Sequence, residues 1–270
     1  MHIINLASGS KANSTFVCYG KTKILIDVGL TEKKLKEELS KIGESLSEIN
    51  AVIITHEHSD HIKALKSLAK NTDIIFYLHN DLAKKLDFND IKFKDGALRT
   101  FENFKFNIGD FEIEPLEVSH DAVRPVSFIV NVHGSKSRAA FVTDLGIVGD
   151  NIKNKLLGVK IIFIESNYDE EMMEGCSYPY IVKQRIKGEK GHLSNNQSLD
   201  LAKFLYENGT KCFVLSHISQ NSNTYEKAYV NYAEYFENQG LVLGKDIVIK
   251  VSFQDKPGNK FLINEEFYGE

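Results

Sequence analysis

The sequence predicts an α/β (α+β) fold in which two β-sheets pack face to face between outer layers of helices, a four-layer αββα sandwich. Two observations support this prediction. Short apolar segments with the spacing of strands occur in both halves of the chain, and amphipathic helical patterns lie between them. Two sheets that bury one face against each other need helices to cover their outer faces, so the order of the elements indicates the fold class.

The first half of the chain alternates strands and helices. Strands are expected at residues 2–8, 15–20, 23–29, 51–56 and 74–79, and several of them end in Gly, Asp or His. Thr31 opens a helix over 31–42, and a second helix is expected over 61–70. Polar side chains therefore stand at the ends of buried strands.

The second half begins with strands that we expect to be antiparallel and continues with short buried strands. The antiparallel strands are expected at 104–108, 111–120, 126–133 and 139–144, and the buried ones at 161–166 and 212–217. Ser194 and Gln197 predict a capping box at the start of a helix over 194–209. A last helix over 223–240 precedes a strand over 246–253, and residues 167–180 are expected to form an irregular loop at a surface rim.

Length and composition bound the organisation of the chain. Its 270 residues contain no repeat, linker or low-complexity stretch, so we expect one domain over 1–270. A hydrophobic content of 42% with 26% charged residues is ordinary for a soluble globular protein, and we see neither a membrane span nor a secretion signal. We therefore expect a cytoplasmic location without a membrane partner.

Cysteine spacing and net charge exclude two further classes. Cys18, Cys176 and Cys212 show no paired C-x-x-C spacing, which argues against a disulfide framework or a thiolate zinc site and predicts buried thiols. The net charge of −4 does not attract phosphate at long range, so any nucleic-acid binding must be local. The oligomeric state is not readable from the sequence.

The segment "THEHSDHI" (55–62) contains three of the nine histidines of the chain together with an aspartate. Such a cluster should arise by chance in roughly one chain per thousand, so metal coordination is the better interpretation. His56 and His58, at the end of a strand, can project to the same side, whereas Asp60 and His61 enter the next helix. One turn can therefore serve two metal ions, and these ligands suit zinc, manganese or iron better than calcium.

The ligands still missing are expected at the ends of other strands. His120 in "EVSHDA", Asp144 in "FVTDLG" and His217 in "VLSHIS" each follow an apolar run. Strands that end at one rim of a layered fold would bring them together. Each residue alone is as consistent with a structural role as with coordination, but together they complete two sites. The remaining candidates His2, His79 and His133 are expected to be structural.

Five ordered motifs make the sequence similar to the metallo-β-lactamase-fold hydrolases over essentially the whole chain. The motifs are Asp27 in "LIDVG", the histidine cluster, His120, Asp144 and His217. The resemblance implies a four-layer αββα metallo-β-lactamase sandwich and two divalent metal ions, Zn²⁺ or Mn²⁺. It implies that His56, His58 and His120 hold one ion, that Asp60, His61 and His217 hold the other, and that Asp144 bridges them. It also implies that Asp27 orients the metal-binding loop.

Further stretches resemble the YycJ/WalJ group of bacterial nucleases within that fold. They are "LASGSKANS", "THEHSDHI", "VSHDA", "TDLG", "ESN" and "GHLSN". Ala12 stands where the group has Gly, and Tyr168 stands where it has His; these departures concern two loops and not the metal ligands. The resemblance implies a DNA exonuclease that acts from 5′ ends in DNA repair or processing.

The segment beginning "KGHLSNNQSLD" resembles the corresponding part of transfer-RNA-processing ribonuclease Z. There the matching histidine, paired with a glutamate that falls at Glu165 here, assists at the scissile phosphate. This resemblance implies catalytic roles for His192 and Glu165. We expect Asp60 to accept a proton from the attacking water and an imidazolium at His192 to donate to the leaving oxygen. The structural alternative is that His192 only hydrogen-bonds a loop.

Basic residues near His192 are candidates for binding a phosphate backbone. The candidates for substrate binding are Lys11, Arg124, Lys183, Arg185, Lys187 and Lys190, together with the backbone donors of Ser194 and Asn195 at the start of a helix. The alternative for the segment "VKQRIKGEKGH" is a solvated helix face, which charge runs usually are. If the patch binds a polyanion, affinity should fall steeply with salt.

The metal motif alone does not select the substrate, because the fold hosts thioesterases, lactonases, β-lactamases, iron proteins and nucleases. By resemblance, His58 stands where the iron oxidoreductase branch usually has Glu, which favours a hydrolase. Many RNA-processing members insert a large cap between the metal aspartate and the last metal histidine, and the interval from Asp144 to His217 is too short for one.

We therefore expect an open site and a two-metal phosphodiesterase with a nucleic-acid substrate, DNA being favoured over RNA. Three alternatives remain at this point: a thioester or lactone hydrolase, an RNA-processing nuclease, and a non-catalytic metal-dependent sensor or scaffold.

Overall fold

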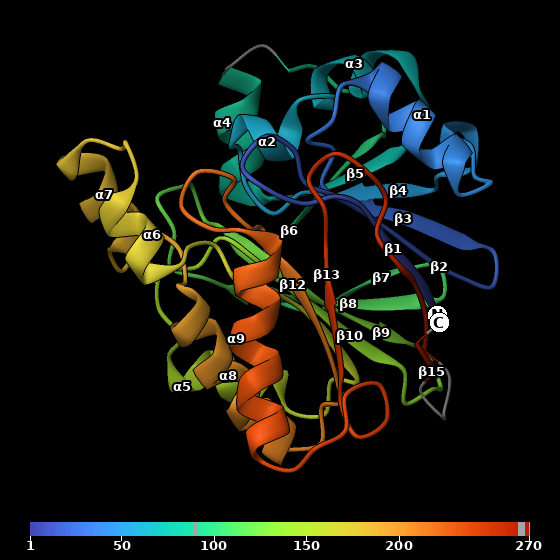
Figure 1. The fold of residues 1–270 in the computed structure, drawn as a ribbon. Helices are drawn as coiled ribbons and strands as arrows, with labels where there is room; N and C mark the ends of the chain where they lie inside the picture. Colours follow the sequence, from blue (N-terminus) through green and yellow to red (C-terminus); the bar gives the residue numbers. More distant parts are fainter. Residues whose placement is uncertain (89–90, 264–267, 270) are drawn as a thin grey trace.

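Two β-sheets lie against each other and carry helices on their outer faces in the computed structural model, which describes residues 1–88, 91–263 and 268–269 (Figure 1). In spatial order the first sheet contains β15 (Tyr268–Gly269), β14 (Lys260–Leu262), β1 (His2–Ala7), β2 (Ser14–Tyr19), β3 (Thr22–Ile26), β4 (Ala51–Ile53), β5 (Ile75–His79) and β6 (Leu98–Phe101). The second contains β13 (Val248–Val251), β12 (Cys212–Ser216), β11 (Ile161–Glu165), β10 (Arg138–Val142), β9 (Val126–Val132), β8 (Phe111–Glu117) and β7 (Phe106–Ile108).

Helices lie between many of these strands along the chain. They are α1 (Glu32–Lys41), the 3₁₀ turn η1 (Leu46–Glu48), α2 (Ser59–Ile62), α3 (Leu65–Asn71), α4 (Asn80–Phe88), α5 (Asp150–Leu156), α6 (Glu170–Gly175), α7 (Tyr180–Lys187), α8 (Asn195–Glu207) and α9 (Tyr225–Asn238). Helices α1, α3 and α4 cover the first sheet, and α5, α8 and α9 cover the second. Within the described parts of the chain, no helix has the length and apolar character needed to cross a membrane.

Alternate residues of the central strands pack into different hydrophobic cores. In β11, Ile161 and Phe163 lie in the core shared by the two sheets, whereas Ile162 and Ile164 pack beneath the helices of the second sheet. Successive side chains of a strand point to opposite faces, so an uninterrupted apolar strand fills two cores at once. The result is one core between the sheets and one under each helical layer, which confirms the predicted four-layer sandwich.

Helix starts agree with the capping signals in the sequence. The Thr31 side chain accepts from Lys34 N at the start of α1. At α8, the Ser194 side chain accepts from Gln197 N, and Ser194 N donates to the Gln197 side chain, which confirms the predicted capping box. A capped amino end satisfies donors that the first helical turn leaves free.

Two expected elements differ from the structure. The helix expected over 61–70 is divided into α2 and α3, because Ala64 N donates to Val28 O at 2.9 Å instead of to its own helix. The expectation of an irregular loop throughout 167–180 is wrong, since α6 lies within it. The Asp169 side chain caps this helix by accepting from Met172 N, and Met173 is buried beneath it.

Other local expectations are met in part. Strands β7 to β10 are antiparallel, as expected. Helices α4 and α5 and strands β6 and β14 were not anticipated from the sequence. Cys212 is buried, but Cys18 and Cys176 are partly exposed, so the expectation of buried thiols is correct only for Cys212.

The parallel strands of both sheets direct their carboxyl ends to the same edge of the sandwich. Strands β3 and β4 are parallel in the first sheet, and β10, β11 and β12 are parallel in the second. The candidate metal-site residues follow within three positions of the strand ends: Asp27 after β3, His56 after β4, Asp144 after β10, and His217 after β12. The fold therefore gathers at one edge residues that are up to 190 positions apart in the chain (27 to 217).

Candidate metal centre

The loop between β4 and α2 carries the histidine cluster and is fixed by backbone hydrogen bonds. Asn13 N donates to Asp60 O at 2.7 Å, and Val28 N donates to His61 O at 2.8 Å. At Gly29 an added Cβ would lie 1.6 Å from Asp60 O, so the close approach requires glycine. Neighbouring chain segments therefore hold the position of this loop.

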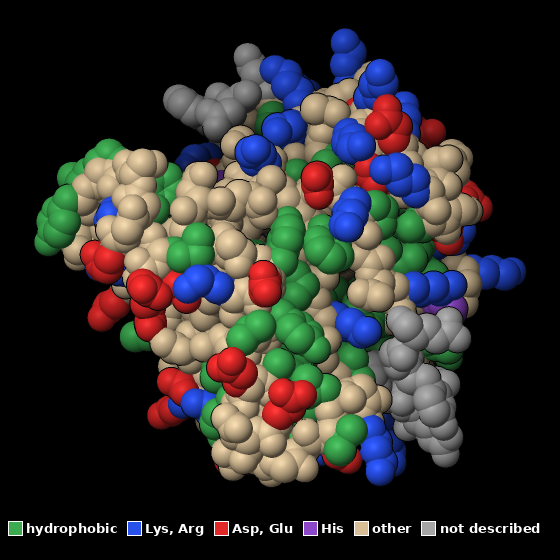
Figure 2. All heavy atoms as spheres, viewed as in Figure 1, with side chains coloured by type: hydrophobic (Ala, Val, Ile, Leu, Met, Phe, Trp, Pro, Cys, Tyr) green, Lys and Arg blue, Asp and Glu red, His purple; other side chains and the backbone are tan. Residues whose placement is uncertain are grey.

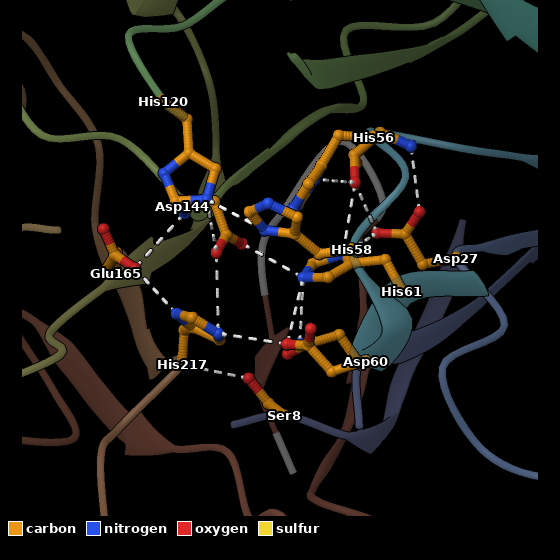
Figure 3. A network of polar contacts seen from close by, with 12 residues as sticks. Ser8, Asp27, His56, His58, Asp60, His61, His120, Asp144, Glu165 and His217 are labelled. Atoms are coloured by element: carbon orange, nitrogen blue, oxygen red, sulfur yellow. Dashed lines mark hydrogen bonds and ion pairs between the residues drawn. The ribbon is translucent and has the colours of Figure 1, made fainter. Parts of the chain in front are cut away.

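The first donor set consists of one nitrogen each from His56, His58 and His120, all within 4.8 Å of one another (Figure 3). His120 Nε2 lies 3.3 Å from His58 Nδ1. His56 and His120 are almost completely buried, and His56 Nε2 has no hydrogen-bond partner. Three imidazoles thus direct nitrogens to one point, as in protein zinc sites.

The second donor set consists of Asp60, His61 and His217, whose donor atoms also lie within 4.8 Å of one another. Asp60 Oδ2 is 3.5 Å from His61 Nε2 and 3.7 Å from His217 Nε2. His217 Nε2 is buried without a hydrogen-bond partner. This set mixes one carboxylate with two imidazoles, which suits zinc or manganese.

Asp144 lies between the two sets. Its Oδ2 is 3.3 Å from His61 Nε2, and its Oδ1 is 3.6 Å from His217 Nε2 and 3.7 Å from His120 Nε2. Asp144 Oδ2 is buried and lacks a hydrogen-bond partner. Buried polar atoms without partners are costly, and three of them belong to these residues: His56 Nε2, Asp144 Oδ2 and His217 Nε2. A divalent cation would satisfy them, so the residues present fit the metal ions that the fold implies.

In His61 and His120 the second ring nitrogen is held by a hydrogen bond, which fixes the direction of the first. His61 Nδ1 donates to Asp27 Oδ2 at 2.7 Å, and His120 Nδ1 donates to the backbone oxygen of Gly191 at 3.1 Å. Asp27 also accepts from Thr55 N at 2.9 Å and from Thr55 Oγ1 at 2.8 Å. Such partners orient metal-binding imidazoles, and Asp27 lies where its expected role requires it.

Backbone strain is concentrated at this centre. Asp27, Asp144 and His217 have positive φ angles of 60°, 59° and 54°. This conformation costs a non-glycine residue about 1–2 kcal/mol, and strained residues tend to cluster at functional sites. Each of the three comes within two residues of a strand end, so the sheet scaffold holds side chains in a geometry that isolated chain segments would avoid.

Glu165, at the end of β11, is completely buried and connects two histidines. Its Oε1 accepts from His192 Nδ1 at 2.9 Å and from His217 Nδ1 at 2.7 Å. It also accepts from the backbone N–H groups of Asp144 and Leu193, at 3.2 and 3.1 Å. Burial alone would raise the pKa of Glu165, but His192 and His217 outweigh it and lower the pKa to about 2.

The buried carboxylates make the centre strongly attractive to cations. Burial alone would lower the pKa of His217, but the carboxylates of Asp144, Asp60 and Glu165 raise it to about 10. The pKa of His61 is raised against burial by Asp144 and Asp27 in the same way. These imidazoliums balance the negative charge in the metal-free protein, a role that a divalent cation would take over.

A cavity of about 300 Å³ opens onto the donor sets. His58, Asp60 and His192 line its floor, together with other residues of the two donor sets. Tyr178 and Arg185, from the segment around α7, form part of its wall. The candidate ligands are therefore accessible to a substrate.

The basic candidates differ in where the structure places them. Arg185 lines the cavity, and its Nη2 lies 2.5 Å from Asp121 Oδ2. Lys11 is exposed and follows Ser10, which lines the cavity. Lys190 is exposed but does not line the cavity.

Two other basic candidates are engaged elsewhere. Lys187 pairs with Glu174 at 2.5 Å. Arg124 pairs with Asp81 at 3.4 Å and with Glu117 at 3.2 Å, and it does not line the cavity. The structure thus places Arg185 in the cavity that opens onto the candidate metal ligands, whereas Arg124 and Lys187 do not line this cavity.

The expectation that Ser194 and Asn195 offer backbone donors to a phosphate is contradicted by the structure. Ser194 N donates to the Gln197 side chain, and Asn195 N donates to Tyr168 O, each at 2.9 Å. Both residues are buried and neither lines the cavity. The capping box and the neighbouring chain segment already use these donors, so they are not free to bind a ligand.

Two residues near the donor sets were not identified from the sequence. Asn13 Nδ2 donates to Asp60 Oδ2 at 3.0 Å. Asp121 Oδ1 lies 3.4 Å from His120 Nε2. Both stand inside motifs with a recognisable pattern, "LASGSKANS" and "VSHDA", and that position is the signal that could have identified them.

The two departures from the group pattern are accommodated by the fold. Ala12 is buried, and its φ is not positive, so this position does not demand glycine. Tyr168 is buried and pairs through its backbone with Ser194. Burial, followed by the charges of Glu170 and Glu165, raises the pKa of Tyr168 to about 12, so its hydroxyl stays neutral.

Known proteins with related sequences support the resemblance. The model of the β-lactamase superfamily domain matches residues 22–218. "Exodeoxyribonuclease YycJ" of Bacillus anthracis is 31% identical over 251 residues, which cover 91% of this chain and 92% of the relative. "Exodeoxyribonuclease WalJ" of Streptococcus pneumoniae serotype 2 (strain D39 / NCTC 7466) is 33% identical over 247 residues, covering 90% and 91%.

A solved structure agrees with this fold. The metallo-β-lactamase fold protein YhfI from Bacillus subtilis matches with a TM-score of 0.71 at 14% identity. The match covers 97% of this chain and 100% of that chain. The expected metallo-β-lactamase sandwich is therefore confirmed.

Proposed function

Because the chain belongs to the β-lactamase superfamily, we propose that it is a two-metal phosphodiesterase that degrades DNA from an end. Two relatives that match about nine-tenths of the chain are named exodeoxyribonucleases, which supports this substrate class. Attack from the 5′ end and a role in DNA repair or processing belong to the same proposal, as does the action of residues 1–270 as one domain. Such a role would place the protein in the cytoplasm, in agreement with the expectation from the sequence.

The observation that carries the proposal is the meeting of two complete donor sets at Asp144. His56, His58 and His120 would hold one Zn²⁺ or Mn²⁺ ion, and Asp60, His61 and His217 the other, with Asp144 shared. When bound, a pair of divalent cations supplies Lewis acidity, which favours ionisation of a water and neutralises charge on a phosphate. The buried donors without partners, His56 Nε2, Asp144 Oδ2 and His217 Nε2, agree with this assignment.

His192 and Glu165 have the geometry of a proton donor and its orienting carboxylate. His192 Nδ1 donates to Glu165 Oε1, which turns Nε2 of the same ring away from the carboxylate. The His192 side chain is partly exposed and lines the cavity, so a substrate can reach it. In its charged form, His192 would donate from Nε2 to the leaving oxygen of the phosphodiester, and Glu165 would hold the ring in place.

We assign to Asp60 the acceptance of a proton from the attacking water, a role for which its carboxylate must be ionised. Asn13 Nδ2 donates to Asp60 Oδ2, and the pKa of this carboxyl lies far below its usual range. Burial opposes this shift, but the imidazoles of His217 and His61 outweigh burial and keep Asp60 ionised. At the mouth of the cavity, the Arg185 guanidinium can contact a non-bridging phosphate oxygen.

The test is a nuclease assay on end-labelled linear DNA and RNA with zinc, manganese or magnesium. We expect nucleotides to be released from DNA faster than from RNA in at least one of these metals. An Asp144→Asn variant should be inactive, because the shared ligand is lost. Absence of nucleotide release from DNA under all three metals would remove the proposal.

The same assay, extended to small thioesters and lactones as substrates, separates the alternative functions. A thioester or lactone hydrolase would turn over small esters whether or not His192 is present. An RNA-processing nuclease would release nucleotides from RNA faster than from DNA. A non-catalytic sensor would bind metal but hydrolyse none of these substrates, with wild-type and Asp60→Asn proteins equally inert.

A further inference from the structure

Two large hydrophobic side chains stand exposed at the start of α7. Tyr180 and Ile181 are neighbours in the chain, and each is 77% exposed. The segment from α6 to α7 projects from the body of the protein in Figure 1, and hydrophobic side chains gather at its outer end in Figure 2. Leaving such side chains in water forgoes burial free energy, and grouped exposed hydrophobic residues commonly mark a binding surface.

The helix that exposes these residues also forms a wall of the candidate active site. Val182, Arg185 and Ile186 of α7 line the cavity, as does Tyr178 just before the helix. The exposed pair therefore lies within one or two residues of cavity-lining positions on each side.

The helix is fixed relative to His192. His192 N donates to Ile186 O at 2.8 Å, and an added Cβ at Gly191 would lie 2.1 Å from the same oxygen. On the other side, Tyr178 OH accepts from Asn221 Nδ2 at 2.7 Å. A group held against the start of α7 is thus also held in register with the candidate proton donor.

The charge of α7 fits a polyanion. Its sequence "YIVKQRIK" contains Lys183, Arg185 and Lys187 and no acidic residue, in a chain whose net charge is −4. Arg185 pairs with Asp121 and Lys187 pairs with Glu174, whereas Lys183 Nζ donates to the backbone oxygen of Glu174. An aromatic and aliphatic surface next to cations is the combination with which proteins bind single-stranded nucleic acid.

We infer that Tyr180 and Ile181 form a stacking surface for the unpaired bases next to the scissile phosphate. Lys183 of α7 attracts the backbone, and the apolar pair holds the bases of the separated end so that the phosphate lies beside His192. Base stacking tolerates any sequence, because every base presents an aromatic face. This inference rests on the proposed nuclease function and adds to it the residues that select a base-bearing, unpaired substrate.

The test compares an ordinary oligonucleotide with one whose first three residues lack bases. For wild-type protein, we expect kcat/KM to be about tenfold higher on the oligonucleotide with bases. The double variant Tyr180→Ala/Ile181→Ala should hydrolyse both at the lower rate, since the surface that reads the bases is gone. Tyr180→Phe should keep the preference, because the aromatic face remains.

Three controls make the outcome decisive. Hydrolysis of the oligonucleotide without bases should be equal in wild-type and double-variant proteins, and their Tm values should agree, because both residues are exposed. Phe104→Ala, at a side chain that is 74% exposed outside the cavity lining, should keep the preference. A double variant that still prefers the base-bearing oligonucleotide tenfold would overturn the inference, as would a wild-type protein without any preference.

The failure of the inference is distinct from that of the proposed function. If the wild-type protein hydrolyses no oligonucleotide, the nuclease proposal itself is lost. The surface could instead receive a second copy of the chain. Light scattering that shows a dimer for the wild type and a monomer for the double variant, with the base preference retained, would assign the face to that contact and refute base stacking.

Discussion

Replacement of Glu165 by glutamine tests whether this carboxylate holds the candidate centre together. Glutamine keeps the size of the side chain but removes its charge and exchanges one acceptor oxygen for an NH₂ donor. Glu165 Oε1 faces the N–H groups of Asp144, His192 and His217, and Oε2 faces those of Leu145 and Leu193. Whichever oxygen is exchanged, at least two buried donors lose their acceptor.

The expected loss of stability follows from these contacts. Removing one partner of a buried, charged network costs about 3–5 kcal/mol of unfolding free energy. Since 1 kcal/mol shifts the Tm of a protein of this size by about 2–4 °C, we expect Glu165→Gln to lower Tm by roughly 10 °C. Differential scanning calorimetry on chelator-treated protein measures the effect without a contribution from metal binding.

The matched control is Glu174→Gln. Glu174 is two-thirds exposed and its carboxylate pairs with Lys187 at the surface, so its replacement should leave Tm unchanged within the precision of the measurement. A Tm of Glu165→Gln within 2 °C of the wild type would refute the reasoning, because the N–H groups that face the exchanged oxygen would then have found other partners.

Three further predictions concern residues with separate contacts. His192→Ala should lower kcat for DNA hydrolysis by roughly 10²- to 10⁴-fold while metal content, measured by atomic emission, stays at the wild-type level. A parallel loss of metal would show that His192 supports metal binding instead of proton donation. Asp27→Ala removes the acceptor of His61 Nδ1 and should weaken metal binding by about 10- to 100-fold in a competition titration with a chelator, whereas unchanged affinity would argue against an orienting role. Gly29→Ala places a Cβ against Asp60 O and should lower the free energy of unfolding, measured in urea, by about 1–3 kcal/mol. The control is Gly149→Ala, where an added Cβ meets nothing within 4 Å. Equal effects of the two substitutions would contradict the steric argument.

Local patterns in the sequence were sufficient to predict the layers of the fold. The apolar run at Ile161–Glu165 fills two cores because side chains alternate along any strand, whatever surrounds it. Capping at Thr31 and Ser194 also depends on residues three positions away. By contrast, the helix expected over 61–70 is divided because Ala64 bonds to Val28, a distant partner that periodicity cannot reveal.

The sequence by itself determined the chemical nature of the donors and the spacing of the histidine cluster, since both are properties of consecutive residues. Only the tertiary structure decided which groups remain free at the centre. Asn195 N donates to Tyr168 O, Arg124 forms an ion pair with Asp81, and Glu165 accepts hydrogen bonds from His217 as well as from His192. A hydrogen-bonding group can satisfy few partners, and the partner it takes is set by the chain segments that the fold brings beside it.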